Sequence, residues 1–283
     1  MLRPLRLFLS AFCFVMFFTG SLLLGLVFCP FLWLLTLGRK EKVRDIATSF
    51  IGKGYGYFIL CLRIMGLIGV PEKITPPPEL EGRSYVLVAN HPTLLDVTFF
   101  LNAFPGLTCV VKKSWYDFFF FGALLRSTHY LPNADVDDDG LGANVLDRMI
   151  AHVKSGHPLA MFPEGTRSLA TSLHRFKRGA FELAERAGVP LVMVFVDVDR
   201  PFLMKNVPFW KTASGRARYR FRILDVVEPS ENGDQGLQRR NDAQRKFEEA
   251  FRASLEERAI KDLPPETESD PLRDSSAELT QPR

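Results

Sequence analysis

Residues 85–96 read YVLVANHPTLLD. The first five of these residues are apolar and have polar neighbours on both sides, which predicts a short buried strand from Tyr85 to Ala89. The polar cluster that follows predicts a turn, and a helical segment is expected from about Thr93 to Ala103. A strand that runs through a polar turn into a helix is the unit from which layered α/β domains are built.

The same alternation continues further along the chain. Apolar runs that predict strands lie at residues 107–111, 159–162 and 191–196, and helical spacing is found at 142–155 and 179–187. Strands that alternate with helices pair in parallel and are covered by helices on the faces of the sheet. A last run, Tyr219–Val227, alternates well enough to predict an edge strand. The sequence therefore predicts an α/β fold with a mostly parallel sheet flanked by helices.

The N-terminal region from Leu7 to Leu37 contains no charged residue. A helix needs ~20 apolar residues to cross the hydrocarbon core of a bilayer, so this run is long enough. It is too long for a secretory signal peptide, and no small-x-small cleavage site follows it. Pro30 lies near its end, which leaves a kinked or re-entrant helix as open as a straight one. We expect an uncleaved, membrane-embedded helical segment.

Basic residues flank this apolar region on both sides. Those between Arg39 and Arg44 outnumber Arg3 and Arg6, which favours a cytoplasmic location for the rest of the chain at the membrane. A second apolar stretch follows at residues 43–70. Its amphipathic pattern predicts a helix that lies on the bilayer surface, although an ordinary core helix fits the same pattern.

Shifts in composition divide the chain into four parts. The segment from Pro71 to Pro78 predicts a boundary between the membrane anchor with its interfacial helices, at 1–70, and an α/β domain at 71–230. A charged C-terminal helix is expected within 231–262. The tail at 263–283 is rich in Pro, Glu, Ser and Asp, so we expect it to be disordered.

Overall composition excludes some classes of function. A net charge of +4 is too small to indicate nucleic-acid binding, although it suits a surface that meets anionic lipid. The chain has 25 phenylalanines against three tryptophans and six tyrosines, and they cluster in apolar runs as in lipid-facing proteins. The four cysteines lie in apolar surroundings without Cys-x-x-Cys spacing, so we expect neither a disulfide framework nor a zinc site from them.

His91 and Asp96 form the first candidate site, directly after the first strand of the domain. Ligands of parallel sheets collect at the carboxyl ends of the strands, and the pKa of histidine suits a general base near neutral pH. A nearby carboxylate can fix its tautomer. Five positions rotate by about 140° in an ideal helix, so the pair meets only if His91 lies in the turn, which Pro92 favours. The structural alternative is that Thr93 and Asp96 form a helix-capping box.

A second polar cluster, FPEGTRS at residues 162–168, follows another predicted strand. Gly165 permits a tight turn there, and Arg167 can grip a phosphate group with two parallel hydrogen bonds. Lys177 and Arg178 add positive charge at the start of the next predicted helix, where backbone N–H groups already favour anions. The alternative is that a Glu164–Arg167 ion pair only trims the loop.

These motifs resemble those of the glycerolipid acyltransferases related to 1-acylglycerol-3-phosphate acyltransferase. The segments NHPTLLD (90–96) and FPEGTRS (162–168) look like the first and third motifs of that family. The segment VPLVMV (189–194) looks like the fourth, and VKKSW (111–115) resembles the basic segment between the first two. The likeness covers about residues 70–230, and an N-terminal membrane helix region is common in the family.

The resemblance assigns roles to residues of both clusters. It implies that His91 is the general base and that Asp96 is its partner. It implies that the remaining site residues bind the acceptor and its phosphate: Lys112, Lys113, Glu164, Gly165, Thr166 and Arg167. The donor would be acyl-CoA or acyl-carrier protein, and no metal or other cofactor would be required.

One segment departs from the family pattern. Where the second motif usually ends in an arginine, this chain reads Asn133-Ala134-Asp135, followed by an acidic run at 136–139. Negative charge there would repel a phosphate that an arginine should attract. Arg126 is a possible substitute, and the identity of the acceptor stays open.

The expected function is transfer of a fatty acyl group to a hydroxyl of a membrane lipid, 1-acylglycerol 3-phosphate or another lysolipid. One alternative is a CoA-independent lipid transacylase or ester hydrolase, although the chain lacks a Gly-x-Ser-x-Gly nucleophile elbow. Another is a non-catalytic membrane-bound lipid-binding protein that keeps the fold. We further expect an acyl-chain tunnel lined by Phe118 to Phe121 and by the N-terminal helices.

Overall fold

The computed structural model describes residues 3–133, 143–200, 202–203, 215–231 and 233–262. The acidic run at 136–139 and the tail at 263–283, which we expect to be disordered, lie outside these residues. The chain begins with helix α1 (Arg3–Leu23), a π-helical turn (Leu24–Phe28) and helix α2 (Cys29–Leu35). Pro30 is accommodated at the start of α2, directly after the π-helical turn.

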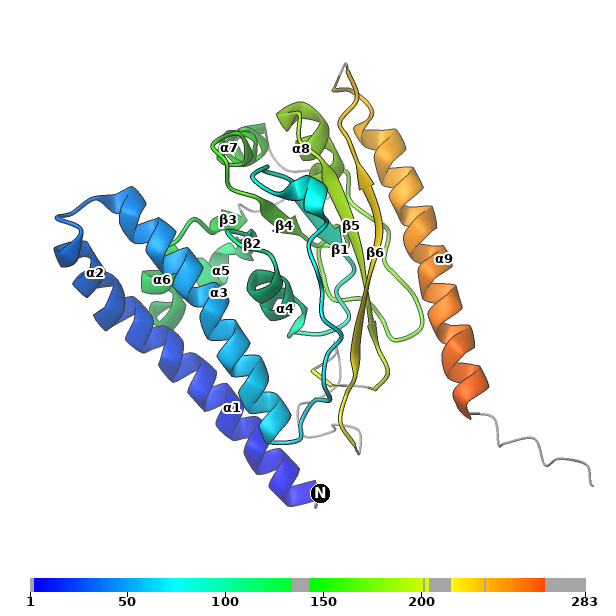
Figure 1. Cartoon of the computed structure of the whole chain (residues 1–283), viewed down its shortest axis with the longest axis horizontal. Coiled ribbons are helices and arrows are strands. Elements are labelled where there is room, and N and C mark those ends of the chain that lie inside the picture. The colour runs from blue at the N-terminus through cyan, green and yellow to red at the C-terminus, as the bar shows by residue number, and fades with distance from the viewer. Residues whose placement is uncertain (1–2, 134–142, 201, 204–214, 232, 263–283) are drawn as a thin grey trace, which may run out of the picture.

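Helix α3 (Lys40–Ile64) follows a turn and lies beside α1, as Figure 1 shows on the left of the view. The Phe17 and Phe58 rings of α1 and α3 are in contact, with centroids 5.4 Å apart. The helical stretch Pro4–Leu35 is long and apolar enough to cross a membrane by length and composition, with a mean hydropathy of 2.3. Apolar side chains remain exposed on α3 as well, including Tyr57 and Ile64.

Six strands form one sheet in the order β3-β2-β4-β1-β5-β6. The strands are β1 (Val86–Ala89), β2 (Thr108–Lys112), β3 (Leu131–Asn133), β4 (Leu159–Met161), β5 (Leu191–Val198) and β6 (Tyr219–Val227). The five strands β1 to β5 pair in parallel, and β6 pairs antiparallel with β5 at one edge. The predicted fold class, a mostly parallel α/β sheet, is confirmed.

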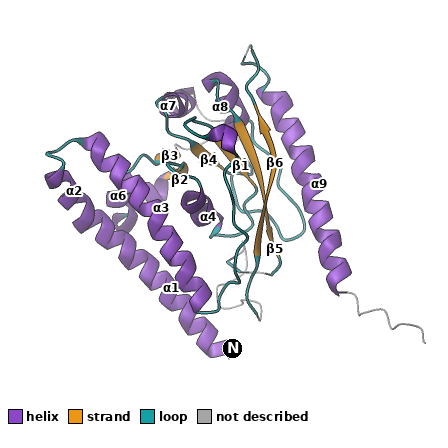
Figure 2. Cartoon of the chain, in the orientation of Figure 1, coloured by secondary structure: helices purple, strands orange, loops and turns teal. Residues whose placement is uncertain are grey.

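Helices cover both faces of the sheet (Figure 2). The remaining helices are a short 3₁₀-helix (Pro78–Leu80), α4 (Asp96–Ala103), α5 (Lys113–Tyr116), α6 (Phe119–Arg126), α7 (Ala143–Lys154), α8 (Gly179–Ala187) and α9 (Gly236–Asp262). Strand β5 shows the separation of the faces: Val192, Val194 and Val196 join the core under α1, α3, α4 and α6. Met193 and Phe195 point the other way and join the core under α7, α8 and α9.

Four short elements lie where the sequence predicted none, namely the 3₁₀-helix, α5, α6 and β3. Strand β3 is short, lies at the sheet edge and contains Pro132, a residue without a backbone N–H to donate. Helix α6 approaches the π-helical turn closely because Gly25 has no side chain. A Cβ atom on Gly25 would lie 2.8 Å from the backbone nitrogen of Leu124.

Candidate active site

The turn between β1 and α4 brings His91 and Asp96 together. His91 Nδ1 lies 3.0 Å from Asp96 Oδ2. The His91 side chain is 18% exposed, while the Asp96 side chain is fully buried. Helix α4 begins at Asp96, three residues later than expected, so His91 lies in the turn and helical rotation does not separate the two side chains. This is the arrangement that the sequence required for contact.

Thr93 holds the Asp96 carboxylate from its other side. The backbone N–H of Thr93 donates to Asp96 Oδ2 at 2.7 Å, and its hydroxyl donates to Oδ1 at 2.5 Å. Asp96 therefore reaches back as in a capping box and contacts His91 at the same time. An ionised carboxylate has no proton to donate, so His91 Nδ1 is the donor in its contact with Asp96. The lone pair of the imidazole ring then lies on Nε2.

Tyr219 of β6 completes this chain of hydrogen bonds. Its hydroxyl donates to Thr93 Oγ1 at 3.3 Å. Burial and the nearby negative charge of Asp96 raise the pKa of Tyr219, so the phenol stays a neutral donor. Tyr219, Thr93, Asp96 and His91 thus form a continuous network that runs from the edge strand to the site.

Asn90 fixes the end of β1 against β5. Its side-chain amide donates to Val196 O at 2.9 Å and accepts from Val196 N at 2.7 Å. The ladder between β1 and β5 pairs backbone groups only as far as Ala89, so this side chain extends the pairing by one more step. His91 therefore begins its turn from a fixed point.

Glu164 and Ser168, in the loop after β4, bind the backbone of His91. The Ser168 hydroxyl donates to the Glu164 carboxylate, and the backbone N–H of His91 points at both Ser168 Oγ, at 3.0 Å, and Glu164 Oε1, at 3.3 Å. Ser168 N donates to His91 O at 2.8 Å, and His174 N donates to Glu164 Oε2 at 2.8 Å. Glu164 is buried, and its carboxylate contacts only the loop after β1 and the loop after β4 among the described residues.

Among the described residues, Arg167 makes no ion pair with Glu164. The alternative interpretation of this loop, in which a Glu164–Arg167 ion pair only stabilises the turn, is therefore not what the structure shows. Arg167 Nη1 instead donates to Leu203 O at 2.9 Å. The same carbonyl accepts from Leu94 N at 3.2 Å, so it joins the two loops. Leu203 has a positive φ of 54°, which is uncommon for a leucine.

Gly165 adopts the left-handed backbone region, with φ +67°, as the predicted tight turn requires. A Cβ there would lie 3.2 Å from Cε of Lys177, so the lysine side chain runs across the glycine. Lys177 N also donates to Pro163 O at 2.8 Å. These contacts bring a lysine to the loop that holds Thr166 and Arg167.

Lys112 and Lys113 lie at the carboxyl end of β2 and the start of α5, where both are exposed. They lie at the same end of the sheet as His91, but β2, which ends at Lys112, is separated from β1 by β4. No hydrogen bond among the described residues joins them to the His91 loop. Arg126, at the end of α6, donates to Tyr116 O at 3.1 Å.

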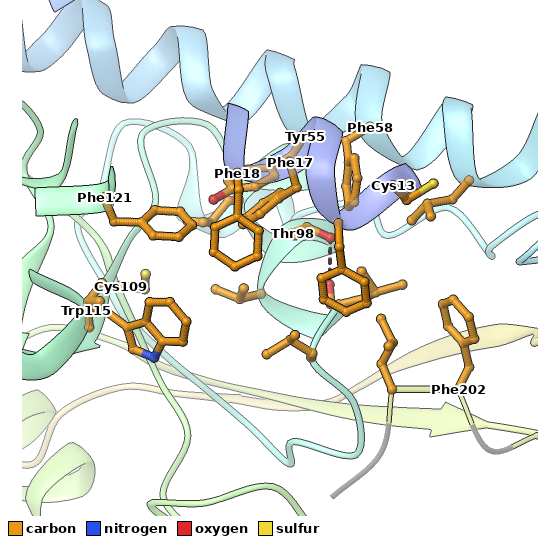
Figure 3. A pocket seen from close by; sticks show the side chains of 18 of the residues that line it. Cys13, Phe17, Phe18, Tyr55, Phe58, Thr98, Cys109, Trp115, Phe121 and Phe202 are labelled. Carbon is orange, nitrogen blue, oxygen red and sulfur yellow. Dashed lines mark hydrogen bonds between the residues drawn. The ribbon is translucent and has the colours of Figure 1, made fainter. Parts of the chain in front are cut away.

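An apolar cavity of about 240 Å³ opens beside the His91 turn. Leu94 and Leu95, just after the turn, are among the residues that line it. Residues of α1 and α3 line it as well (Figure 3). Phe17, Phe58, Trp115 and Phe121 contribute aromatic rings to its wall.

The predicted lining by Phe118 to Phe121 is corrected by the structure. Phe121 lines the cavity, but Phe118 and Phe119 are 41% and 68% exposed. Consecutive residues of a helix point in different directions, so α6 turns Phe121 and Leu125, one helical turn apart, toward the cavity. The predicted contribution of the N-terminal helices to the lining is confirmed.

Several residues of the site were not found from the sequence. Asn90, Ser168 and Tyr219 each contact a partner that is 77 or more positions away. Leu203 contacts Arg167, 36 positions away, and also Leu94. Ser168 lies inside the quoted FPEGTRS segment, which was the available signal. For Tyr219, the only signal was its place on a predicted strand.

Comparison with known proteins finds similarity to acyltransferases over part of the chain. An acyltransferase family model matches residues 70–197. The 1-acyl-sn-glycerol-3-phosphate acyltransferase of Saccharomyces cerevisiae is 32% identical over 136 residues, which cover 46% of this chain and 44% of that protein. The Escherichia coli enzyme of the same name is 29% identical over 179 residues, covering 62% of this chain and 69% of that protein.

A solved structure shares the fold over most of its length. The 1-acyl-sn-glycerophosphate (LPA) acyltransferase PlsC from Thermotoga maritima matches with a TM-score of 0.67 and 21% identity, over 89% of this chain and 97% of that one. The sequence matches are shorter: this chain spans about half the length of some curated relatives, 44% for the yeast protein and 48% for one from Mycoplasma pneumoniae.

Proposed function

Because residues 70–197 match an acyltransferase family model, we propose that this chain transfers a fatty acyl group from a thioester donor to the hydroxyl of a lysolipid. The proposed acceptor is 1-acylglycerol 3-phosphate. The observation that carries the proposal is the contact of His91 with the buried Asp96 beside an apolar cavity. That pair supplies a base, and the cavity supplies a place for a fatty chain.

The chemical step follows from the tautomer of His91. With its Nδ1–H held by Asp96, His91 accepts the proton of the acceptor hydroxyl at Nε2 as the oxygen attacks the thioester carbonyl carbon. A C–O bond forms, and the tetrahedral intermediate collapses with cleavage of the C–S bond. The imidazolium, stabilised by the Asp96 carboxylate, returns its proton to the departing sulfur. The products are a diacyl lipid and a free thiol.

Basic residues at the same sheet edge would hold the acceptor phosphate. Arg167 donates to the carbonyl of Leu203, which lines the cavity, so its guanidinium lies at the border of the space proposed for the fatty chain. Lys177 crosses the same loop at Gly165. We assign phosphate binding to Arg167, with Lys112 and Lys113 at the outer edge, and Thr166 remains a predicted acceptor contact.

We expect Glu164 to position the site and not to contact the acceptor lipid directly. Its carboxylate receives hydrogen bonds from Ser168, His174 N and His91 N, so we propose that it positions the His91 backbone relative to the FPEGTRS loop. Gly165 serves the acceptor site through the backbone conformation that it permits.

The lipid acceptor would reach the site from a bilayer. The apolar stretch Pro4–Leu35 and the exposed apolar face of α3 support contact with the membrane, and α1 and α3 line the cavity directly. We propose a membrane-bound enzyme whose α/β domain lies on the cytoplasmic side, as the basic residues after α2 predict.

The test is a thioester assay on the full chain in detergent. Palmitoyl-CoA and palmitoyl-acyl-carrier protein are each offered with 1-acylglycerol 3-phosphate, its phosphocholine analogue and monoacylglycerol. Free thiol and product lipid are measured together. We expect thiol release that depends on the acceptor, with faster turnover for phosphate-bearing acceptors than for monoacylglycerol.

Other outcomes separate the alternatives. Acyl exchange between lipids without any thioester would indicate a transacylase, and acceptor-independent release of fatty acid would indicate a hydrolase. Absence of turnover with either donor would contradict the proposal and favour a lipid-binding protein. Asp147→Asn serves as the control variant, because it removes an exposed carboxylate of α7 that is remote from the site.

A further inference from the structure

Three of the five histidines of the chain gather at a place that the acyltransferase site does not use. His129 precedes β3, His152 lies on α7, and His157 precedes β4. The His129 and His157 rings are stacked with centroids 3.8 Å apart, and the His152 and His157 centroids are 5.1 Å apart. These residues come from two separate segments, so local sequence does not account for the cluster.

A carboxylate from the N-terminal helices joins the three imidazoles. Asp45 of α3 accepts a hydrogen bond from His129 Nε2, at 2.8 Å from its Oδ1. The Asp45 side chain is 61% exposed, while His129 is 6% exposed. One side of the cluster therefore meets solvent and the other side is enclosed by protein, as in a binding site with an entry path.

The cluster lies at the opposite end of the sheet from His91. His129 and His157 each lie two residues before a strand begins, at Leu131 and Leu159, whereas His91 lies two residues after β1 ends. Because these strands are parallel, their starts share one edge and their ends share the other. The two sites cannot act on the same reacting atoms.

The geometry points to a binding site for a divalent transition metal ion of the zinc class, and we propose that Asp45, His129 and His157 are its ligands. Their ligand atoms lie within 4.8 Å of one another. Zinc takes imidazole nitrogen and carboxylate oxygen at about 2.0–2.2 Å, which sets neighbouring ligand atoms about 3.3 Å apart in a tetrahedron. Binding would bring the three atoms to that spacing by rotating the stacked His129 and His157 rings toward a shared ion. Water from the exposed side would supply the fourth ligand.

The ring nitrogens of His157 make no hydrogen bond within the described part of the chain, so its lone pair is available to an ion. The ion would replace the proton between His129 and Asp45, and binding would release that proton. Imidazole nitrogen also binds nickel and copper, so the donor set selects a class of ions and not a single metal.

His152 supports the site from behind. The Thr108 hydroxyl donates to Pro158 O at 2.9 Å, so it accepts from His152 Nε2–H at 2.8 Å. This pair of bonds fixes the His152 ring against His157. It acts as a positioning residue that limits the rotation of a proposed ligand.

A bound ion would fasten the N-terminal helices to the α/β domain. Asp45 belongs to α3, which lines the cavity, while His129 and His157 belong to loops that lead into the sheet. Coordination would thus add a metal-mediated link between two parts of the chain that already meet through apolar packing and through the hydrogen bonds of His129 with Asp45 and Thr48. The expected consequence is that ion binding raises the thermal stability. This expectation holds whether or not the acyl-transfer proposal is correct.

The experiment uses the full chain in detergent, treated with chelator and then titrated with Zn²⁺ chloride by calorimetry. We expect one ion per chain and a Tm increase of about 5 °C or more at a free Zn²⁺ concentration about 100-fold above Kd. Asp45→Asn and His157→Ala should each weaken binding by at least about 100-fold. Asp147→Asn is the matched control for Asp45→Asn and should bind like the wild type.

Asp45→Asn keeps the test decisive if His157→Ala folds poorly, because the Asp45 side chain is exposed. Absence of stoichiometric binding to the wild type would overturn the proposal. Binding that survives both substitutions, or a Tm that does not respond to Zn²⁺, would overturn it equally. Loss of binding in both variants with retention in Asp147→Asn is the result that supports it.

Discussion

At the scale of single residues, Thr93 has more influence on the site than its size suggests. Its backbone and hydroxyl both donate to Asp96, and the hydroxyl also accepts from Leu95 N and from the Tyr219 phenol. One buried side chain therefore holds the carboxylate that in turn orients His91. Removing it would leave a carboxylate oxygen and a phenol without their partner in a dry environment.

Thr93→Val tests this role. We expect it to lower stability by about 1–3 kcal/mol and to lower kcat by about 10- to 100-fold, because His91 loses its fixed orientation. Unfolding in denaturant and steady-state kinetics measure the two effects. Thr108→Val is the matched control, since the Thr108 hydroxyl is buried and bonds Pro158 O and His152 at the opposite end of the sheet from His91. Equal losses of kcat in both variants would contradict a specific role for Thr93.

At the scale of elements, helix α6 determines which of its phenylalanines line the cavity that we propose for the acyl chain. Phe121→Ala enlarges the cavity, so we expect a shift in preference toward longer or bulkier acyl chains. Phe119→Ala, on the exposed side of the same helix, should leave the preference unchanged. Competition between acyl donors of different length measures it. An unchanged preference in Phe121→Ala would show that this cavity does not hold the chain.

Helix α9 is held on the sheet by a buried charge. Asp197 of β5 accepts from Arg258 and Ser254 of α9 and from Arg220 of β6. Burial would raise the pKa of Asp197, but the hydrogen bonds and charges of Arg258 and Arg220 outweigh it and hold the pKa below its ordinary value. The unfolded chain therefore takes up this proton at higher pH than the folded chain does.

The sign of the pH effect follows from that shift. The stabilisation is present above the unfolded-state pKa of about 3.9 and is lost as pH falls through the lower folded-state value. Asp197→Asn should cost about 2–3 kcal/mol at pH 7, somewhat less than a fully buried pair because both arginines are partly exposed. The difference from wild type should shrink below pH 4, as measured by urea unfolding.

Glu228→Gln is the control for the stability measurement on Asp197→Asn. Glu228→Gln breaks the exposed ion pair between Glu228 and Arg83, where solvent screens the charges, so its stability should stay close to that of the wild type. A constant difference between Asp197→Asn and wild type from pH 7 to pH 3 would contradict the proposed ionisation.

At the scale of the whole molecule, the unusual property is its apolar outer surface. Phe8 and Val15 of α1 are 66% and 63% exposed, on a helix that is long enough to enter a bilayer. Replacing both with Asp should sharply lower the fraction of protein bound to phospholipid vesicles, because each charge is costly in hydrocarbon. Their exposure means that folding itself should tolerate the change.

Leu237→Asp serves as the control for flotation with vesicles. Leu237 is 49% exposed on α9, on the other side of the sheet. If the Phe8 and Val15 variant bound vesicles as tightly as the wild type, α1 would not be the element that contacts the membrane.

Much of this molecule could be predicted from its sequence, for identifiable reasons. The strands β1, β4 and β5 are short apolar runs bounded by polar residues, and α8 and β6 begin and end at the predicted residues. Helix α6 was missed because its continuous apolar run has no helical period. Strand β3 was missed because three residues that include a proline give no strand pattern.

In the candidate site, local contacts could be predicted from the sequence, and contacts between distant segments could not. The contact between His91 and Asp96 is local, so Pro92 and the spacing sufficed to predict its geometry. The contacts of Asn90 with Val196 and of Arg167 with Leu203 join distant segments, and no local pattern encodes them. The cluster that we propose as a metal site was missed for the same reason, because Asp45 and His129 are 84 positions apart.

The central claim is that His91 removes the proton of the acceptor hydroxyl. The most direct measurement is kcat for palmitoyl transfer to 1-acylglycerol 3-phosphate by wild type and His91→Ala, each checked for the same Tm. The account predicts a fall of about 10²- to 10⁴-fold in the variant, with little change in the KM for the acceptor. Full activity in His91→Ala would contradict the account, whatever the acceptor.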